Sequence, residues 1–414
     1  MAPVEEQLAV LLRGADFGDE ETRRTMEREL RDRLEEDRPL RVYCGYDPTA
    51  VDLTLGHTIS MRKLRQFQDL GHDVTFLIGT FTALVGGDPS DKDKHRPMLR
   101  AGQVEEHAAT YVEQAFRILD RERTTVRENA DWLAELRFEE VMRLCSHFTV
   151  AQFLERDNFA RRWERHDAIH LSELLYAILQ AYDAVSLEAD VQVGGSEQLF
   201  NLMAGRALQR EFGQRPQVVL TLPILVGTDG HLRMSKSMGN YIGVDEAPAD
   251  VYGKVMSLPD SAMAGYFELL TSLPADEVDA ILGGGGAGDE LPAMAAKKRL
   301  AYEIVASLHP VDVAAEAQRY FESTIQRRET PAEMPEHALP SAVTSGGDVA
   351  LHRVLVEAGL AASGAEAKRL VTQGAVLVNG ERVADATHPL APGDELRVGR
   401  HRFLRIVAGA GDEA

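Results

Sequence analysis

Short apolar runs alternate with longer amphipathic stretches along the first 245 residues of the chain. The run LRVYCGY at 40–46 is rich in β-branched and aromatic residues, which predicts a buried strand. The turn DPTAVD follows, and apolar residues then recur near helical spacing at Ile59, Met61, Leu64, Phe67 and Leu70. VTFLIGTFTAL at 74–84 predicts the next strand. Strand, turn, helix and strand in this order are typical of a parallel α/β sheet.

The same alternation continues toward residue 226. It predicts helices over 103–120, 137–156, 171–187 and 196–212, and strands near 189–193 and 217–226. The segments DPTAVDLTLGH, GGSEQ and HLRMSKSMGNY each follow a predicted strand. Because ligands of such sheets bind outside the carboxyl ends of the strands, we expect these three segments to meet there.

Changes in composition divide the chain into five regions. We predict a charged helical cover at 1–38, a Rossmann-like α/β domain at 39–245, a helical domain at 246–330, a linker at 331–347 and a small α/β domain at 348–408. Within the cover, residues 5–36 look helical, and GGGGAG at 283–288 interrupts the helical domain. The linker is predicted from its Pro, Ser and Gly content.

The bulk composition excludes several classes of protein. Apolar content of 44% and charged content of 27% are ordinary for a globular protein, and no apolar run reaches membrane-spanning length. The acidic N-terminus does not fit a signal peptide, and the distant Cys44 and Cys145 fit a reducing cytoplasm. A formal net charge of −21 argues against a uniformly basic protein that coats nucleic acid. Residues 349–407 differ, with eight Lys and Arg against six Asp and Glu.

The segment DPTAVDLTLGH has the character of an anion site. A loop that leaves a strand and opens a helix presents free N–H groups and the positive end of the helix dipole. Gly56 allows close approach to the backbone, and His57, Thr49 and Thr54 add donors suited to phosphate. A helix cap with a chance histidine explains the segment equally well at this point.

Two further segments carry polar side chains with two possible readings each. Tyr176, Gln180 and Asp183 fall on one face of the 171–187 helix, either as a solvent face or as a pocket wall. In GGSEQ, Glu197 either complements a helix dipole or accepts hydrogen bonds from ribose hydroxyls.

The loop HLRMSKSMGNY brings two cations, Arg233 and Lys236, into an acidic chain. Lysine offers phosphate a point charge, and arginine offers paired hydrogen bonds. The other interpretation is a solvated, protease-sensitive loop.

These motifs together resemble a known family. TLGH and RMSKS, more than 170 residues apart, resemble the HIGH and KMSKS signatures of class I aminoacyl-tRNA synthetases. The segments YCGYDPTAVDLTLGH, GDPSDK, YAILQAYD, GGSEQ and RMSKSMGNYIG are similar to those of the bacterial tyrosyl-tRNA synthetases. GLAASGAEAKRLVTQGAVLVNGERV resembles the S4 RNA-binding module. The resemblance covers residues 39–245 and 349–407.

The resemblance implies a role for individual residues. Tyr43 and Asp183 match the positions that hold the tyrosine phenol, and Asp88, Tyr176 and Gln180 match those that hold its ammonium group. Around adenosine and ribose, the matching positions are Cys44, Asp47, Gly56, His57, Gly194, Glu197 and Gln198. Near the departing pyrophosphate they are Thr49, Thr54, Arg233 and Lys236. Thr54 replaces the first histidine of HIGH, Arg233 replaces the first lysine of KMSKS, and Glu197 replaces an aspartate.

The resemblance also implies the reaction and the partners. The tyrosine carboxylate attacks the α-phosphorus of ATP, pyrophosphate leaves, and tyrosine then passes to the terminal adenosine of tRNA(Tyr). Mg²⁺ accompanies ATP, and no tightly bound protein metal is expected. Family members act as homodimers, with tRNA crossing between subunits, and no membrane partner is expected. The loop HLRMSKSMGNY is expected to be mobile and to clamp the triphosphate.

The C-terminal region has its own signals. Ser363 and Glu366 are spaced as a capping box for a helix that carries Lys368 and Arg369, and VLVNGERV predicts a hairpin with an Asn-Gly turn at 379–380. A generic small domain with a solvated basic helix is the alternative. The positive charge balance and the S4 resemblance favour RNA contact through phosphates and shape.

Three other functions compete with tyrosine–tRNA ligation. A paralogue that serves a different acceptor conflicts with the S4-like tail. A non-catalytic RNA-binding protein conflicts with the presence of His57 and Lys236. A tryptophanyl enzyme conflicts with Tyr43, Gln180 and Asp183, a set suited to a phenol.

Overall fold

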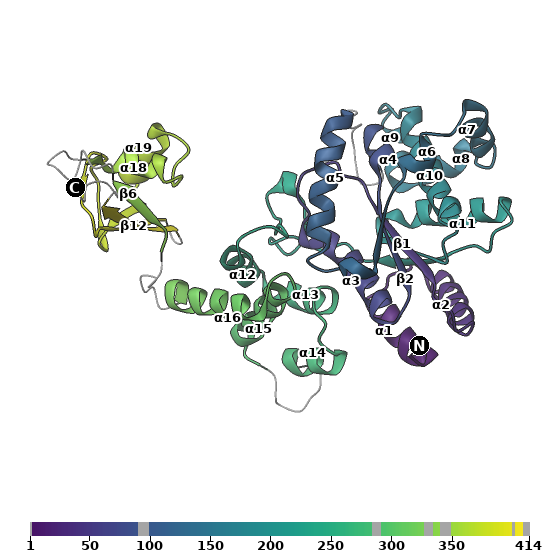
Figure 1. Cartoon of the computed structure of the whole chain (residues 1–414), viewed down its shortest axis with the longest axis horizontal. Helices are drawn as coiled ribbons and strands as arrows, with labels where there is room; N and C mark the ends of the chain where they lie inside the picture. Colours follow the sequence, from purple (N-terminus) through teal and green to yellow (C-terminus); the bar gives the residue numbers. More distant parts are fainter. Residues whose placement is uncertain are drawn as a thin grey trace. The chain divides into compact units, whose positions relative to one another are not determined.

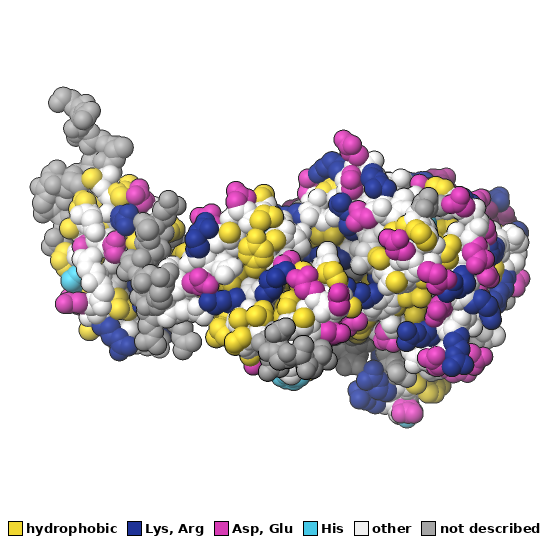
Figure 2. Space-filling view, turned by 90° about the horizontal axis from the view of Figure 1, so that it is seen from below, with side chains coloured by type: hydrophobic (Ala, Val, Ile, Leu, Met, Phe, Trp, Pro, Cys, Tyr) yellow, Lys and Arg dark blue, Asp and Glu magenta, His cyan; other side chains and the backbone are white. Residues whose placement is uncertain are grey.

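The computed structural model describes residues 2–89, 99–283, 291–326, 334–339, 349–399 and 402–408. The chain divides into two compact units, Met1–Ala314 and Ala315–Ala414, and each is considered by itself (Figure 1). In the described part of the chain, no helix is both long and apolar enough to cross a membrane. Figure 2 shows Lys and Arg side chains intermixed with Asp and Glu over the visible face.

The first unit is built on a five-stranded parallel sheet. Its strands are β1 (Arg41–Tyr46), β2 (Asp73–Ile78), β3 (Thr124–Glu128), β4 (Val191–Gly195) and β5 (Val218–Leu222), in the order β3-β2-β1-β4-β5. The chain builds outward from β1 to β3 and then returns to place β4 on the other side of β1. This reversal creates a topological switch point between β1 and β4, where such sheets bind ligands. The predicted α/β fold class is confirmed.

Helices pack around this sheet (Figure 1). They are α1 (Val4–Leu12), α2 (Glu20–Leu34), α3 (Leu55–Asp69), α4 (Thr80–Leu84), α5 (Ala101–Ala115), α6 (Ala130–Leu133), α7 (Phe138–Cys145), α8 (Val150–Leu154), α9 (Asp157–Glu164), α10 (Leu171–Ser186) and α11 (Leu199–Glu211). Five further helices follow β5: α12 (Pro248–Met256), α13 (Met263–Leu270), α14 (Ala275–Leu282), α15 (Ala293–Ala306) and α16 (Val311–Tyr320). Of the predicted interruption at 283–288, Gly283 ends α14 at φ 82°, and 284–288 lie outside the described residues.

Several predicted elements differ from those in the structure. The helix expected over 5–36 is two helices, because Gly14 and Gly18 take left-handed φ values of 70° and 78° between them. The helix expected over 137–156 is divided into α7 and α8, and the Thr149 side chain accepts a hydrogen bond from Gln152 N at the second start. The strand expected over 74–84 ends at Ile78, and α4 follows.

A buried ionic cluster anchors α2 at the amino-terminal edge of the sheet. Asp190 accepts hydrogen bonds from Arg33 at 2.7 Å, Arg38 at 2.8 Å and the backbone N–H of Arg41 at 2.9 Å. Burial by itself would raise the pKa of Asp190, but the hydrogen bonds from Arg38 and Arg41 and the charge of Arg33 lower it to about 2. The cluster lies opposite the carboxyl ends of the strands, so it supports the sheet rather than the ligand edge.

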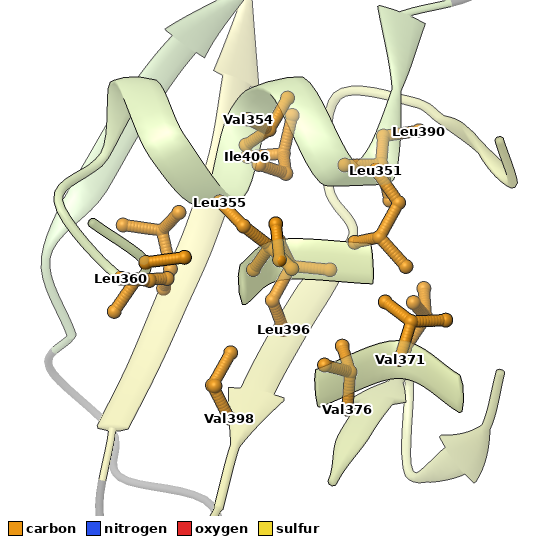
Figure 3. Close-up of a cluster of buried hydrophobic side chains, with 14 of the residues drawn as sticks. Leu351, Val354, Leu355, Leu360, Val371, Val376, Leu390, Leu396, Val398 and Ile406 are labelled. Atoms are coloured by element: carbon orange, nitrogen blue, oxygen red, sulfur yellow. The ribbon is translucent and has the colours of Figure 1, made fainter. Parts of the chain in front are cut away.

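The second unit contains a small mixed sheet against which helices pack. Its strands β6 (Glu336–Leu339), β8 (Val376–Val378), β9 (Glu381–Arg382), β11 (Glu395–Val398) and β12 (Arg402–Ala408) take the order β6-β12-β11-β8-β9. A separate pair joins β7 (Val349–Ala350) to β10 (Pro389–Leu390). Side chains from α18 (Leu351–Glu357), α19 (Gly364–Thr372) and the sheet form one buried apolar cluster (Figure 3).

The local predictions in this unit are partly confirmed. Asn379 and Gly380 take φ values of 51° and 82° between β8 and β9, as the predicted Asn-Gly hairpin turn requires. Ser363 accepts from the backbone N–H of Glu366 at 3.3 Å at the start of α19. The stretch 331–347 is not a linker throughout, because its residues Glu336–Leu339 form β6 and pair in parallel with β12.

Candidate active site

A cavity of about 650 Å³ opens at the carboxyl ends of β1, β4 and β5. Every residue of the sheet domain that the sequence nominated for tyrosine or ATP lines this cavity. They are Tyr43, Cys44, Asp47, Thr49, Thr54, Gly56, His57, Asp88, Tyr176, Gln180, Asp183, Gly194, Glu197, Gln198, Arg233 and Lys236. Segments far apart in sequence therefore meet as the strand order predicts.

One end of the cavity presents a buried carboxyl group beside a buried hydroxyl group. Asp183 on α10 accepts hydrogen bonds from Trp132 Nε1 at 2.8 Å and Asn129 Nδ2 at 3.4 Å. The hydroxyl of Tyr43 on β1 is buried and has no hydrogen-bond partner among the described residues. Burial raises the pKa of Asp183 to about 8. A ligand hydroxyl here can donate to Asp183 and also satisfy Tyr43.

A second carboxyl group, Asp47, connects three neighbouring segments. It accepts hydrogen bonds from the Tyr176 hydroxyl at 2.7 Å, the Thr82 hydroxyl at 2.6 Å and the backbone N–H of Asp88 at 3.0 Å. A Cβ at Gly79 would lie 2.0 Å from Asp47 Oδ1, so only glycine fits at that position. Burial raises the pKa of Asp47 to about 6. Asp47 thus fixes the direction of Tyr176 from α10.

The buried side-chain amide of Asn201 on α11 connects several polar side chains of the cavity. Asn201 Nδ2 lies 3.0 Å from Gln180 Oε1, 3.1 Å from Gln198 Oε1 and 3.4 Å from Asp88 Oδ1. Gln198 Nε2 also donates to Asp88 Oδ2. Asp88 and Gln180, predicted to bind the ammonium group, and Gln198, predicted to bind ATP, therefore belong to a single hydrogen-bond network.

The start of α3 presents a neutral histidine to the other end of the cavity. The backbone N–H of Thr54 donates to His57 Nδ1 at 3.1 Å, and the Thr54 hydroxyl lies 2.9 Å from the same atom. A backbone amide can only donate, so Nδ1 carries no proton and Nε2 carries it. Burial, with a smaller effect of the Lys236 charge, lowers the pKa of His57 to about 4. The ring therefore offers an N–H donor and no charge at neutral pH.

The loop that carries Arg233 and Lys236 is docked against the start of α3. Lys236 Nζ donates to the backbone carbonyl of Asp52 at 2.5 Å. Beyond the loop, Leu55 N donates to Ile242 O at 2.9 Å and Val244 N donates to Leu53 O at 3.0 Å. The two signature segments are thus held together by backbone pairing, which places cations beside His57 in the cavity.

Comparison with known proteins identifies the family. Residues 35–326 match the family described as tRNA synthetases class I (W and Y), and residues 351–396 match the S4 domain. The chain belongs to the class I tRNA synthetases. The resemblance inferred from the sequence motifs is confirmed.

Curated relatives cover nearly the whole chain. A tyrosine–tRNA ligase of Carboxydothermus hydrogenoformans is 45% identical over 412 residues, which span 98% of this chain and 99% of the relative. A tyrosine–tRNA ligase of Oleidesulfovibrio alaskensis is 47% identical over 406 residues, with 98% and 99% coverage. Another, from Thermotoga maritima, is 45% identical over 408 residues, with 98% of each chain covered.

Solved structures agree with the fold. A tyrosyl-tRNA synthetase from Archaeoglobus fulgidus, solved with L-tyrosine, matches with a TM-score of 0.59 and 21% identity, covering 76% of this chain and 100% of the other. A truncated mitochondrial tyrosyl-tRNA synthetase from Aspergillus nidulans matches with a TM-score of 0.61 and 23% identity, with 79% and 94% coverage.

The sequence did not identify every polar residue of this synthetase's site. Asn129 and Trp132 follow β3, a strand that we did not predict because its TTVRE sequence is polar and largely exposed. Thr82 was assigned to a strand but lies in α4. Asn201 follows Gln198 by three residues, a spacing that places both on neighbouring turns of a helix and could have identified it.

The nominated RNA contacts lie in the second unit of the synthetase. Lys368 and Arg369 are both exposed on α19, and Arg369 lies 3.8 Å from Glu366. No group of three or more His, Cys, Asp or Glu side chains suited to a metal ion occurs in the described ranges.

Proposed function

We propose that this chain is a tyrosine–tRNA ligase that activates L-tyrosine with ATP and transfers it to tRNA(Tyr). The observation that carries the proposal is that Asp183, held by Trp132, acts electrostatically on the buried hydroxyl of Tyr43, for which the described residues provide no geometric hydrogen bond. A phenol that enters between them gives Asp183 a further donor and Tyr43 a hydrogen-bond partner, whereas the side chain of phenylalanine supplies neither.

We infer that the amino-acid half of the site binds both the phenol and the ammonium group of tyrosine. The phenol donates to Asp183 and lies beside Tyr43. The ammonium group is bound by Asp88, Tyr176 and Gln180, whose positions are supported by the Asp47 and Asn201 contacts described above. An ionised carboxylate and polar oxygens suit an ammonium group that can donate three hydrogen bonds.

The ATP half of the site then performs activation without a protein nucleophile. A tyrosine carboxylate oxygen forms a bond to the α-phosphorus, the bond from that phosphorus to the bridging oxygen breaks, and pyrophosphate leaves with the electron pair. His57 donates through Nε2–H, and Thr49, Thr54, Arg233 and Lys236 lie on the pyrophosphate side. Cys44, Asp47, Gly56, Gly194, Glu197 and Gln198 surround adenosine and ribose. Positioning and charge stabilisation supply the catalysis.

Mg²⁺ arrives bound to ATP and neutralises phosphate charge. In the second step a hydroxyl of the terminal adenosine of tRNA attacks the tyrosyl carbonyl, and AMP leaves. Lys368 and Arg369 of the S4 domain contact the tRNA through its phosphates. We also propose a cytoplasmic location, because Cys44 and Cys145 are both free, which fits a reducing compartment.

We further propose that the enzyme is a homodimer that associates through helices α7 to α10. Each of these helices carries a large apolar side chain that is more than half exposed: Phe138, Met142, Val150, Trp163 and Leu171. The four helices share one buried cluster that includes Leu144, Phe153, Phe159 and Ala177. The exposed apolar side chains therefore lie on helices that pack together as one group. We propose that a second copy of the chain binds this surface, because members of the family act as homodimers.

The proposal is tested by pyrophosphate exchange into ATP, with tyrosine, phenylalanine or tryptophan as the amino acid. We expect exchange with tyrosine alone, and its loss in Lys236→Ala. Arg24→Ala is the control, because Arg24 lies on the exposed surface of α2 and, among the described residues, pairs with Glu20. Exchange with tryptophan alone would assign a different substrate, and no exchange at all would contradict the ligase function. Charging of tRNA(Tyr) then tests the second step.

A further inference from the structure

The loop that carries Arg233 and Lys236 is organised around one buried amide side chain. Asn240 is only 6% exposed. Its Oδ1 accepts from the backbone N–H of Ser235 at 2.8 Å, and its Nδ2 donates to the backbone carbonyl of Arg233 at 3.0 Å. These two bonds hold the backbone on both sides of Met234. Lys236, the second cation, follows directly after the bonded Ser235.

The same amide is held in place by Asp229. Asn240 Nδ2 donates to Asp229 Oδ2 at 2.5 Å, while Asp229 Oδ1 accepts from the backbone N–H groups of His231 at 3.0 Å and Leu232 at 2.8 Å. A Cβ on Gly227 would lie 2.3 to 2.5 Å from Asn240, so the turn closes tightly over the amide. We call Asp229, Asn240 and the two bonded backbone groups the Asn240 clasp.

The surrounding contacts fix the base of the loop. Met234 N donates to Leu225 O at 2.8 Å, and Val226 pairs with Arg233 as an antiparallel bridge. The buried Tyr266 of α13 donates its hydroxyl to Val226 O at 2.7 Å. Asn240 itself is absent from the described residues that line the cavity, whereas Arg233, Ser235 and Lys236 line it.

We propose that Asn240 is a positioning residue for ATP activation, acting through the backbone of Arg233 and Ser235. The inference rests on the proposed role of the loop cations at the pyrophosphate side. By fixing the backbone on both sides of Met234, the clasp keeps the two cations in one arrangement relative to each other when the loop meets ATP. The clasp requires an amide, because the same side chain must accept from Ser235 and donate twice.

The first test is Asn240→Ala in the full chain. We expect tyrosine-dependent exchange to fall about 10- to 100-fold in kcat/KM for ATP, since misplaced cations weaken transition-state contacts. The dissociation constant of tyrosine, measured by equilibrium dialysis without ATP, should stay within about twofold of the native value. Limited trypsin digestion should cleave faster after Arg233 and Lys236. Leu232→Ala is the matched control, because it removes an exposed side chain from the same turn and keeps the backbone N–H that donates to Asp229.

A pair of charge exchanges tests the clasp independently of loop truncation. Asn240→Asp places a carboxylate against Asp229, and Asp229→Asn places an amide against Asn240, so each single variant should lose exchange activity. The double variant Asp229→Asn/Asn240→Asp can pair across that contact again, and it should recover part of the activity and of the trypsin resistance. It lacks the bond to the Arg233 carbonyl, so recovery should be incomplete.

Three results would overturn the proposal. The first is native exchange activity in Asn240→Ala, and the second is a loss of tyrosine affinity equal to the loss in exchange, which would indicate general unfolding. The third is an absence of recovery in the double variant while both single variants fold, as judged by Tm. If the native chain shows no exchange, the proposed function itself fails, and the clasp has no role in activation.

Discussion

Asp183 is the residue at which function and stability make opposite demands. Its carboxyl group is buried at the end of the cavity, and only Trp132 and Asn129 donate to it among the described residues. A hydrogen-bond acceptor at this point suits a phenol, but an ionised carboxylate without a cation is unfavourable in a buried place. The position is therefore expected to lower the stability of the ligand-free protein.

This argument gives a pH dependence with a definite sign. Burial raises the pKa of Asp183 from 3.8 to about 8, so between these values the folded chain binds a proton that the unfolded chain has lost. Stability from this group is greatest below pH 3.8 and falls as pH rises toward 8, by at most about 1.4 kcal/mol per pH unit. Asp183→Asn should therefore raise Tm more at pH 8 than at pH 5 while weakening tyrosine binding. An equal change in Tm at both pH values, measured by calorimetry, would contradict it.

Asn201 allows a second prediction at the residue scale. Because it holds Gln180 and Asp88, Asn201→Ala should loosen the site for the ammonium group and leave the phenol site unchanged. Tyrosinol should bind about 10-fold more weakly to the variant, corresponding to roughly 1.4 kcal/mol. The same compound without its amino group should bind the variant and the native chain equally, as measured by calorimetric titration. Equal weakening of both compounds would place the effect elsewhere.

At the scale of elements, periodicity predicted the buried strands and missed the exposed one. β1, β4 and β5 are apolar because both faces are covered, whereas the edge strand β3 needs no apolar face and has the pattern of a loop. The end of β2 was also predicted wrongly, because the segment TFTAL would have an apolar face either as a strand or as a helix. Its helical structure in α4 depends on two tertiary hydrogen bonds, from the Thr82 hydroxyl to Asp47 and from the Phe81 backbone N–H to Asn129.

The exposed apolar side chains on α7 to α10 give a prediction at this scale. Leu171→Asp places a charge in the proposed interface and should shift the protein toward monomers, as measured by sedimentation velocity over a range of concentrations. Arg24→Ala, on the surface of α2, serves as the control. Native protein that sediments as a monomer would reject the interface, as would a dimer unaffected by the substitution.

At the scale of the whole molecule, the chain is acidic, but its C-terminal residues 349–407 have a small positive charge balance. The cavity contains the groups that the proposed function assigns to tyrosine and ATP. Under that proposal, activation requires only the first unit, and the S4 domain contributes to binding the tRNA. The two units can be tested separately by assays with and without tRNA.

The double variant Lys368→Ala/Arg369→Ala makes this separation measurable. Pyrophosphate exchange without tRNA should be unchanged, because neither residue belongs to the cavity. The affinity for tRNA(Tyr) should fall, and the slope of log K against log salt should decrease by about two if each cation contacts one phosphate. A filter-binding series in salt checks this, and an unchanged slope would reject both residues as phosphate contacts.

The alternating α/β architecture, the family, the hairpin at Asn379 and many of the residues that line the cavity were predictable from the sequence alone. These features depend on local periodicity, turn chemistry and motifs, which are properties of neighbouring residues. Only the tertiary structure decided which groups touch. It joined Trp132 to Asp183 and Thr54 to His57 Nδ1 by hydrogen bonds. It also paired β6 with β12 and joined Asn240 to the backbone carbonyl of Arg233. Such contacts depend on how distant segments pack and on which donors are left unpaired once the core has formed.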